Sequence, residues 1–248
     1  MTPLQFLAAV VPSAGVYCVA ELSSKKKQHV FSEDIDDLEG AVDSFNTKNY
    51  DTYFALASFV EPGKRTAENA LYLRSVFMDI DCGEGKAYPS KQAAAVALDA
   101  FLQESQLDKL GNPWLVSSGG GLHVYWPFTQ DIPVKDWRVA AENTKRLCRK
   151  YNLDIDFTVT GDAARVLRVP GTRNWKDKKN PRTVKILNAG GTFTFADFSQ
   201  AVREPLNGEA ILPAVEPLLG TRPDFKRETP STVKLVENLT TVFRDRKS

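Results

Sequence analysis

Two aspartates one residue apart, Asp79 and Asp81, interrupt the otherwise apolar segment 75–82. The segment has the composition of a β-strand, and side chains on a strand alternate between its two faces. Both carboxylates therefore point the same way, and their apolar neighbours point the other way. Two anions on one face repel each other, and a divalent cation bound between them removes that repulsion. Carboxylates and substrate phosphates are common ligands of Mg²⁺ and Mn²⁺. The alternative is a solvated strand end, because the loop 83–85 follows at once.

A second group of polar residues surrounds three consecutive glycines between two expected strands, 113–118 and 122–128. Glycine lets the backbone approach a ligand closely, and successive backbone N–H groups can bind an anion. Flanking hydroxyls and one imidazole complete a group that suits a phosphate-bearing ligand. The alternative is a plain turn followed by a structural histidine. The residues of this group are Ser117, Ser118, Gly119, Gly120, Gly121 and His123.

A third group combines carboxylates with the cations that follow them. Asp154, Asp156 and Asp162 come first, and then Arg165 and Arg168 lie among valine and leucine, where an unpaired charge is costly. Such a patch suits a triphosphate, or a nucleic-acid backbone with a stacked base. The alternative is a solvated basic loop. The patch continues through Arg173, Asn174, Trp175 and Lys176.

Two further groups of lysines, Lys178–Lys179 and Lys25–Lys27, are interpreted differently. The first follows the patch in a polar loop, and the second occupies the expected tip of a hairpin. We expect both groups to be solvated surface residues, with contact to phosphate as the alternative for Lys25–Lys27.

The composition limits the classes of protein that this chain can represent. Its 248 residues are 42% apolar and 25% charged, which is typical of a globular protein. The net charge of +1 gives no global attraction to nucleic acid, so such affinity depends on local patches. Three cysteines and two histidines exclude a disulfide framework and a multi-histidine metal site. No apolar run of membrane length is present, and we expect a cytoplasmic protein without membrane contact.

The elements that must position these residues follow from periodicity and turn signals. A hairpin is expected at 15–22 and 28–31, a helix at 34–45, and one strand at 51–60, before the acidic strand. Helices are expected after Ser90 and at 133–151 and 196–202, with further strands at 166–169, 183–187 and 192–195.

The end of the chain has a different composition. Residues 204–230 are rich in proline and glycine and are typical of a connector. Residues 231–248 have the apolar spacing of a short amphipathic helix, which we expect to begin a further module. The expected division is therefore a catalytic domain at 1–203, a connector at 204–230 and a C-terminal helix at 231–248.

Taken in chain order, the three groups resemble the motifs of the archaeo-eukaryotic primase superfamily, and within it the primase-polymerases of phages and plasmids. The resemblance implies an α+β fold. An RNA-recognition-like antiparallel sheet would carry the acidic strand and pack with a smaller N-terminal α/β unit. The residues that carry the resemblance are Asp79-Ile80-Asp81, then Ser118-Gly-Gly-Gly-Leu-His123, then Asp156 with Arg165-Val-Leu-Arg168-Val-Pro-Gly-Thr-x-Asn174.

The resemblance also implies a role for each residue. Asp79, Asp81 and Asp156 would hold two Mg²⁺ or Mn²⁺ ions. Asp154 and Asp162 are the alternatives to Asp156 as the third ligand. The catalytic residues would be these three aspartates and His123. The nucleotide-binding residues would be Ser117, Ser118, Gly119, Gly120, His123, Arg165, Arg168 and Asn174, and nucleic acid would contact Arg173, Trp175 and Lys176.

The activity that the resemblance implies is DNA-templated nucleotidyl transfer, as a primase or DNA polymerase that releases pyrophosphate. The expected partners are a single-stranded DNA template with its primer, NTP or dNTP, and a helicase or accessory module C-terminal to this chain. Two alternatives remain: a metal-dependent nuclease that uses the same carboxylates, and a non-enzymatic protein that binds a replication origin.

Overall fold

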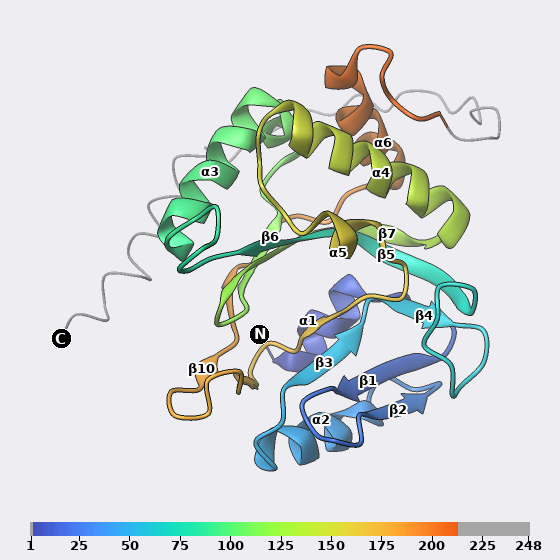
Figure 1. Cartoon of the computed structure of the whole chain (residues 1–248). Helices are drawn as coiled ribbons and strands as arrows, with labels where there is room; N and C mark the ends of the chain where they lie inside the picture. Colours follow the sequence, from blue (N-terminus) through green and yellow to red (C-terminus); the bar gives the residue numbers. More distant parts are fainter. Residues whose placement is uncertain (1, 213–248) are drawn as a thin grey trace.

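The structure is a computed structural model that describes residues 2–212 (Figure 1). Residue 1 and residues 213–248, which include most of the expected connector and the expected C-terminal helix, lie outside the described part. The helices are α1 (Pro3–Val10), α2 (Leu38–Thr47), α3 (Lys91–Glu104), α4 (Val134–Lys150), α5 (Phe157–Gly161) and α6 (Phe195–Arg203), with short 3₁₀ turns η1 (Leu107–Leu110) and η2 (Glu204–Leu206). The strands are β1 (Tyr17–Glu21), β2 (Gln28–Ser32), β3 (Thr52–Ala55), β4 (Ala57–Phe59), β5 (Ala70–Asp81), β6 (Trp114–Ser117), β7 (Gly121–Pro133), β8 (Val166–Arg168), β9 (Arg173–Asn174), β10 (Arg182–Thr183) and β11 (Lys185–Asn188).

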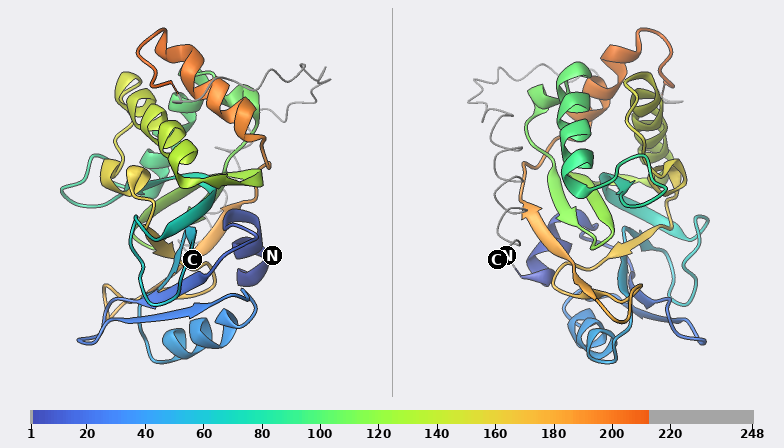
Figure 2. Two further views of the ribbon diagram at one scale, coloured as in Figure 1. Left: turned by 90° about the vertical axis from the view of Figure 1, so that its right-hand side faces the viewer. Right: turned by 60° about the vertical axis from the view of Figure 1, so that its left-hand side comes forward.

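The larger sheet has the strand order β11-β6-β7-β5-β4, and all of its neighbouring strands are antiparallel. Its centre is the long pairing of β5 with β7, which ends where Asp81 faces Gly121. Helices α3, α4 and α6 lie together on one side of this sheet, and the N-terminal unit lies on the other (Figures 1 and 2). Because both faces are covered, residues 76–78 of β5 and 124–126 of β7 are apolar and fully buried.

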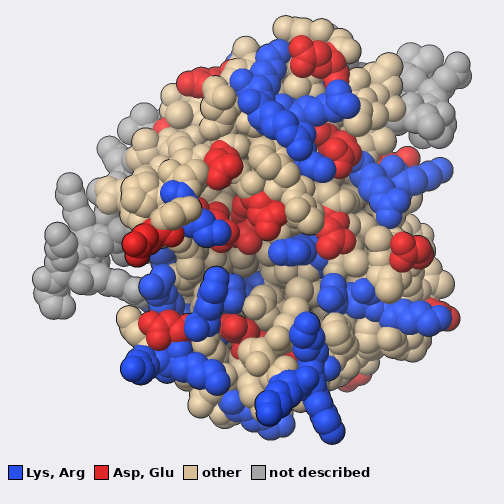
Figure 3. Space-filling view, viewed as in Figure 1, with Lys and Arg blue, Asp and Glu red and all other residues tan. Residues whose placement is uncertain are grey.

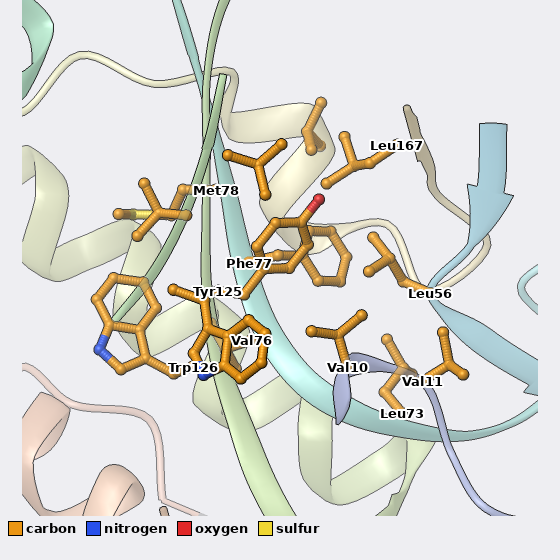
Figure 4. Packing of buried hydrophobic residues seen from close by; sticks show 14 of the residues in the cluster. Val10, Val11, Leu56, Leu73, Val76, Phe77, Met78, Tyr125, Trp126 and Leu167 are labelled. Atoms are coloured by element: carbon orange, nitrogen blue, oxygen red, sulfur yellow. The ribbon is translucent and has the colours of Figure 1, made fainter. Parts of the chain in front are cut away.

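The smaller, N-terminal unit has an antiparallel sheet with the order β2-β1-β3-β8, against which α2 packs. Helix α1 joins this unit to the larger sheet through Phe6. The ring of Phe6 lies 5.8 Å from Phe54 on β3 and 5.4 Å from Tyr125 on β7, measured between centroids. The core is therefore continuous between the two sheets, as Figure 4 shows for Phe77, Tyr125 and Leu167.

The single strand expected at 51–60 is wrong. The chain forms β3 in the smaller sheet, and after Leu56 it continues as β4 in the larger sheet. Leu56 is fully buried, and its backbone N–H donates a hydrogen bond to the carbonyl oxygen of Arg165 rather than to a strand of either ladder. This stretch is continuously apolar because it is buried between two sheets. One long buried strand would have the same apolar pattern, so the sequence does not distinguish the two structures.

A second expectation, the strand at 192–195, is also wrong. Phe193 makes only an isolated bridge with Phe128, and the Thr194 side chain then caps α6 by accepting a hydrogen bond from Asp197 N. The short helix α5 is absent from the sequence-based interpretation. The hairpin, the helices at 133–151 and 196–202, and the helix capped by Ser90 are confirmed.

The first residues of the expected connector, 204–212, lie against α4. Leu206 is fully buried, and Asn143 of α4 exchanges two hydrogen bonds with the backbone of Ile211, at 2.8 and 2.7 Å. The Lys150 ammonium also donates to the Pro205 carbonyl oxygen. Among the described residues, no helix combines the length and apolar character that crossing a membrane requires.

Candidate functional site

The candidate site lies at the end of β5, where this strand pairs with the start of β7. Asp79 is directly opposite His123, and Asp81 is opposite Gly121. Met78 and Ile80 are fully buried on the other face, so the predicted alternation is confirmed. Two of the three groups of residues found in the sequence therefore meet across a single pair of strands.

His123 is buried between Asp79 and Tyr125. Its Nε2 atom lies 3.9 Å from Asp79 Oδ1, and its Nδ1 atom lies 3.2 Å from the Tyr125 hydroxyl. Burial, and then the nearby charges of Arg168 and Arg165, lower the pKa of His123 to about 3. The imidazole is therefore neutral at physiological pH, and its contact with Asp79 is not an ion pair.

Asp79 is in an unfavourable position for a charged carboxylate. Its side chain is only 20% exposed. Burial, followed by repulsion from the Asp81 and Asp156 carboxylates, raises the pKa of Asp79 to about 7. The site thus carries concentrated negative charge that Arg165 and Arg168 offset only in part.

Asp156 comes to this site through its backbone. Its N–H donates a 2.8 Å hydrogen bond to the carbonyl oxygen of Asp79. Its Oδ1 atom caps α5 by accepting hydrogen bonds from Thr158 N and Val159 N, and its Oδ2 atom lies 4.0 Å from the Arg165 guanidinium.

The other two aspartates of this segment have different surroundings. The Asp162 side chain accepts a hydrogen bond from Ala164 N, and the backbone of Asp154 is bonded to the Tyr88 hydroxyl. The two carboxylates whose repulsion raises the pKa of Asp79 are those of Asp81 and Asp156. Asp156, rather than Asp154 or Asp162, is therefore the carboxylate of this segment whose charge affects Asp79.

The three carboxylates surround the site without forming a closed metal cage. Within residues 2–212, no three histidine, cysteine, aspartate or glutamate side chains converge closely enough to coordinate one ion. Asp81 instead pairs with Lys86 at 2.7 Å, and both of these side chains are about half exposed. A solvent-exposed pair of this kind is weak, so a divalent cation can replace the ammonium at Asp81.

The glycine turn is held closed by Ser118. Its N–H donates to the Gly121 carbonyl oxygen, and its Oγ atom accepts from Gly121 N, both at 3.0 Å. Gly119 has a φ of +87°, and a Cβ atom there would lie 2.8 Å from Asn174 Cβ. Glycine is therefore required at position 119 both by the backbone conformation and by the approach of the loop that contains Asn174.

Asn174 connects the segment that follows β8 to this turn by a hydrogen bond. Its Nδ2 atom donates to the Ser118 carbonyl oxygen at 2.9 Å, and its Oδ1 atom accepts from Lys176 N. The Arg182 guanidinium donates to the Gly119 carbonyl oxygen. A pocket of about 210 Å³ lies beside the turn between Gly120 and these residues.

Two cations at the turn were not among the predicted site residues, although Arg182 belongs to the basic stretch 165–185. Arg182 lies outside the motif that ends at Asn174, and Lys91 is the first residue of α3, from which its ammonium donates to Ser117 Oγ at 2.8 Å. Only the packing of α3 and β10 against the turn brings them there.

Arg168 is held by two residues that sequence reasoning also missed. Its Nε atom donates to Asp51 Oδ1 at 3.3 Å, and its guanidinium donates to the Tyr53 hydroxyl at 3.0 Å. Arg165 is less constrained: its side chain is 34% exposed, and its Nε atom is buried with no hydrogen-bond partner among the described residues. Both arginines act on Asp79, but Arg168 is held by Asp51 and Tyr53, whereas Arg165 pairs only loosely with Asp156.

The residues expected to contact nucleic acid do not gather in one place: Lys176 lines the pocket beside the glycine turn, and Trp175 lies next to Asp51. The backbone N–H of Trp175 donates to Asp51 Oδ1 at 2.8 Å, and the Arg173 guanidinium lies 5.9 Å from the Trp175 ring centroid. In the space-filling view, acidic side chains gather near the middle of the face, with basic side chains above and below them (Figure 3). The charge distribution across this face is thus strongly patterned although the net charge is only +1.

A scan against protein-family models gives no match, and a search of curated proteins gives none either. Solved structures do match. The archaeo-eukaryotic primase (AEP) domain of the cyanophage S-2L primase-polymerase is 17% identical with a TM-score of 0.57, and the match covers 80% of this chain and 95% of that one.

A second solved primase, RepB′, is also similar. It is 15% identical with a TM-score of 0.51, over 83% of this chain and 63% of its own. Its catalytic domain in complex with initiator DNA is 15% identical with a TM-score of 0.50, over 82% of this chain and 95% of its own. The α+β class with antiparallel sheets is confirmed, and the RNA-recognition-like character of the sheet stays a prediction. The chain has the fold of an archaeo-eukaryotic primase-type domain.

Proposed function

We propose that this chain is a nucleotidyltransferase of the primase-polymerase type, which copies a single-stranded DNA template from NTP or dNTP and releases pyrophosphate. The observation that carries the proposal is the position of Asp79, Asp81 and Asp156 around one strand end, with His123, Arg165 and Arg168 beside them. A primase-polymerase domain and a primase with the same fold support it.

The donor set of the site fits divalent metal ions. Asp79 is repelled by two neighbouring carboxylates, and Asp81 already binds a cation, the Lys86 ammonium. Oxygen ligands of this kind suit Mg²⁺ or Mn²⁺, and we assign Asp79, Asp81 and Asp156 as the residues that would hold two ions. When bound, such ions polarise a phosphoryl group and stabilise the attacking and leaving oxygens of the transfer.

The remaining residues act on the charge of the nucleotide. Arg165 and Arg168 neutralise the developing negative charge of the leaving phosphates, and neutral His123 positions the triphosphate by a hydrogen bond. The backbone N–H groups of Gly119 and Gly120, with the hydroxyls of Ser117 and Ser118, bind phosphate oxygens. No covalent intermediate with the protein is required, so the site needs no nucleophilic serine or cysteine.

The partners in this proposal are the DNA template, its primer and the nucleotide. The RepB′ catalytic domain in complex with initiator DNA supports a DNA partner. Arg173, Trp175 and Lys176 would contact the template strand. Replication of phage or plasmid DNA in the cytoplasm of a prokaryotic host, with a helicase or accessory module as a further partner, completes the proposal.

The experiment that tests the proposal measures synthesis directly. The protein is incubated with a primed or unprimed single-stranded DNA template, Mn²⁺ or Mg²⁺, and NTP or dNTP. We expect extended products and equimolar release of pyrophosphate, and neither with Asp79→Asn. A protein that incorporates no nucleotide on any template under these conditions is not a primase-polymerase.

Two alternatives give different results in the same experiment. A metal-dependent nuclease shortens the labelled DNA and releases no pyrophosphate. A non-enzymatic origin-binding protein binds DNA with an affinity that Asp79→Asn does not change, and it incorporates no nucleotide.

A further inference from the structure

A second pocket, of about 520 Å³, lies on the N-terminal unit. Three segments that are far apart in the sequence form it: residues 23–25 after β1, residues 48–50 after α2, and the loop that contains Trp175 and Lys178. Its volume is within the range of roughly 300–1,000 Å³ that is typical of ligand pockets. The pocket therefore has room for part of a nucleotide chain.

The lining of this pocket is cationic and aromatic. Lys25, Lys48 and Lys178 come from three different segments, and within residues 2–212 no acidic side chain lines the pocket. Tyr50 and Trp175 supply two aromatic rings. Cations that follow a phosphate backbone, together with rings on which bases stack, are the combination by which proteins bind single-stranded nucleic acid.

The wall formed by residues 23–25 is fixed by a buried carboxylate. Glu21 is fully buried and accepts hydrogen bonds from Ser23 N at 3.1 Å and Ser24 N at 3.0 Å, and from both serine hydroxyls. The Ser23 hydroxyl in turn accepts from Asp51 N. A wall that is already ordered loses little conformational entropy when a ligand binds.

Asp51 connects this pocket to the candidate active site. One of its carboxylate oxygens, Oδ1, accepts hydrogen bonds from Trp175 N and from Arg168 Nε. Trp175 lines the pocket, whereas Arg168 acts on Asp79 and His123. The pocket and the active site are therefore linked through the Asp51 carboxylate.

We propose that this pocket binds the single-stranded DNA template next to the active site, with a base stacked on Trp175 and the phosphates on Lys25, Lys48 and Lys178. The inference rests on the proposed function, and it gives the template strand a defined path over the N-terminal unit. It differs from the interpretation of Lys25 and Lys178 as solvated surface residues, because both side chains line this one pocket.

The experiment measures binding apart from catalysis. A short fluorescein-labelled oligothymidylate is titrated with the protein in EDTA, without nucleotide, and its anisotropy gives the dissociation constant at several salt concentrations. Trp175→Ala should weaken binding on the order of 5- to 150-fold, because stacking of one base is lost, and Trp175→Phe should retain much of the affinity.

The lysines give a second, independent measurement. Lys48→Ala should reduce the slope of log K against log salt concentration by about 0.7, and removing all three lysines should reduce it by about 2. Lys109→Ala is the matched control, because Lys109 lies on η1, outside the pocket, and bonds only to Gln106 in the described structure. Thermal melting shows whether each variant is folded.

Unchanged affinity and salt slope in folded Trp175→Ala and Lys48→Ala would overturn the proposal, as would an equal loss for blunt duplex DNA, which offers no unstacked base. Because the assay contains no nucleotide, its result is distinct from that of the synthesis test. An enzyme that extends primers while its pocket variants bind normally retains the proposed nucleotidyl transfer and loses this inference, together with the contact assigned to Trp175.

Discussion

The backbone N–H of Asp156 donates a 2.8 Å hydrogen bond to the carbonyl oxygen of Asp79. The third carboxylate of the site is therefore positioned by the main chain, while its own Oδ1 atom caps α5. The Asp156 side chain thus contributes a negative charge to the site and a cap to α5, and two different substitutions separate these contributions.

Asp156→Asn keeps an oxygen that can cap α5 and removes the negative charge. We expect it to abolish nucleotide incorporation with little change in stability. Asp156→Ala should abolish incorporation and also cost about 0.5–2 kcal/mol of stability, because the cap is lost. Primer extension and thermal unfolding of both variants check this. Near-normal extension by Asp156→Asn would remove Asp156 from the metal ligands.

The raised pKa of Asp79, about 7, has a consequence for the metal-free protein. Between its ordinary value of 3.8 and about 7, the unfolded chain releases this proton and the folded protein retains it, so stability falls as the pH rises through this range. Asp79→Asn should therefore stabilise the metal-free protein at about pH 8, on the order of a few kcal/mol, and the gain should shrink toward pH 4.

Chemical unfolding in EDTA at several pH values measures this gain. Asp99→Asn on α3 is a comparison variant: burial, and then repulsion from Asp108, also raise the pKa of Asp99, so this substitution should likewise stabilise the protein more at higher pH. A gain for Asp79→Asn that is independent of pH would contradict the explanation by repulsion and burial.

His123→Ala should reduce nucleotide incorporation on the order of 100-fold, because one hydrogen-bond donor to the triphosphate is lost. Affinity for single-stranded DNA should change little. Tyr125→Phe is the control, since it removes the hydroxyl beside His123 Nδ1 and keeps the imidazole. Steady-state kinetics with nucleotide as the varied substrate, together with DNA binding, test the assignment. Loss of DNA binding with unchanged use of nucleotide would show that His123 is misplaced.

Arg165→Ala and Arg168→Ala should both reduce incorporation severely, but they should differ in stability. Arg165 is a third exposed, so its loss should leave the fold intact. Loss of Arg168 leaves the buried Asp51 carboxylate without its cation and should cost about 1–3 kcal/mol. Denaturant unfolding of the two variants side by side tests the difference, and equal stability would contradict it.

Truncation tests the boundary expected near residue 203. Because Asn143 exchanges hydrogen bonds with Ile211 and Leu206 is fully buried, a chain that ends at residue 212 should keep its stability and its activity. A chain that ends at residue 205 should melt at a lower temperature. Equal melting temperatures would place the end of the folded domain before η2, as the sequence composition predicts.

Local patterns in the sequence predicted the strand face on which the acidic residues lie. Alternation is a property of any strand, so Asp79 and Asp81 had to share a face wherever β5 packed. The serine cap of α3 and the closely spaced glycines are equally local signals. The order of the three groups, and with it the resemblance to the primase superfamily, was likewise available before the structure.

Only the tertiary structure decided which distant residues meet. Asp51 joins Arg168 to Trp175, Lys91 reaches Ser117, and the chain crosses between the two sheets at Leu56. No periodicity links residues that lie tens of positions apart. Their contacts follow from how the two sheets pack around α1, and that packing depends on the shape and burial of the whole core rather than on any single segment.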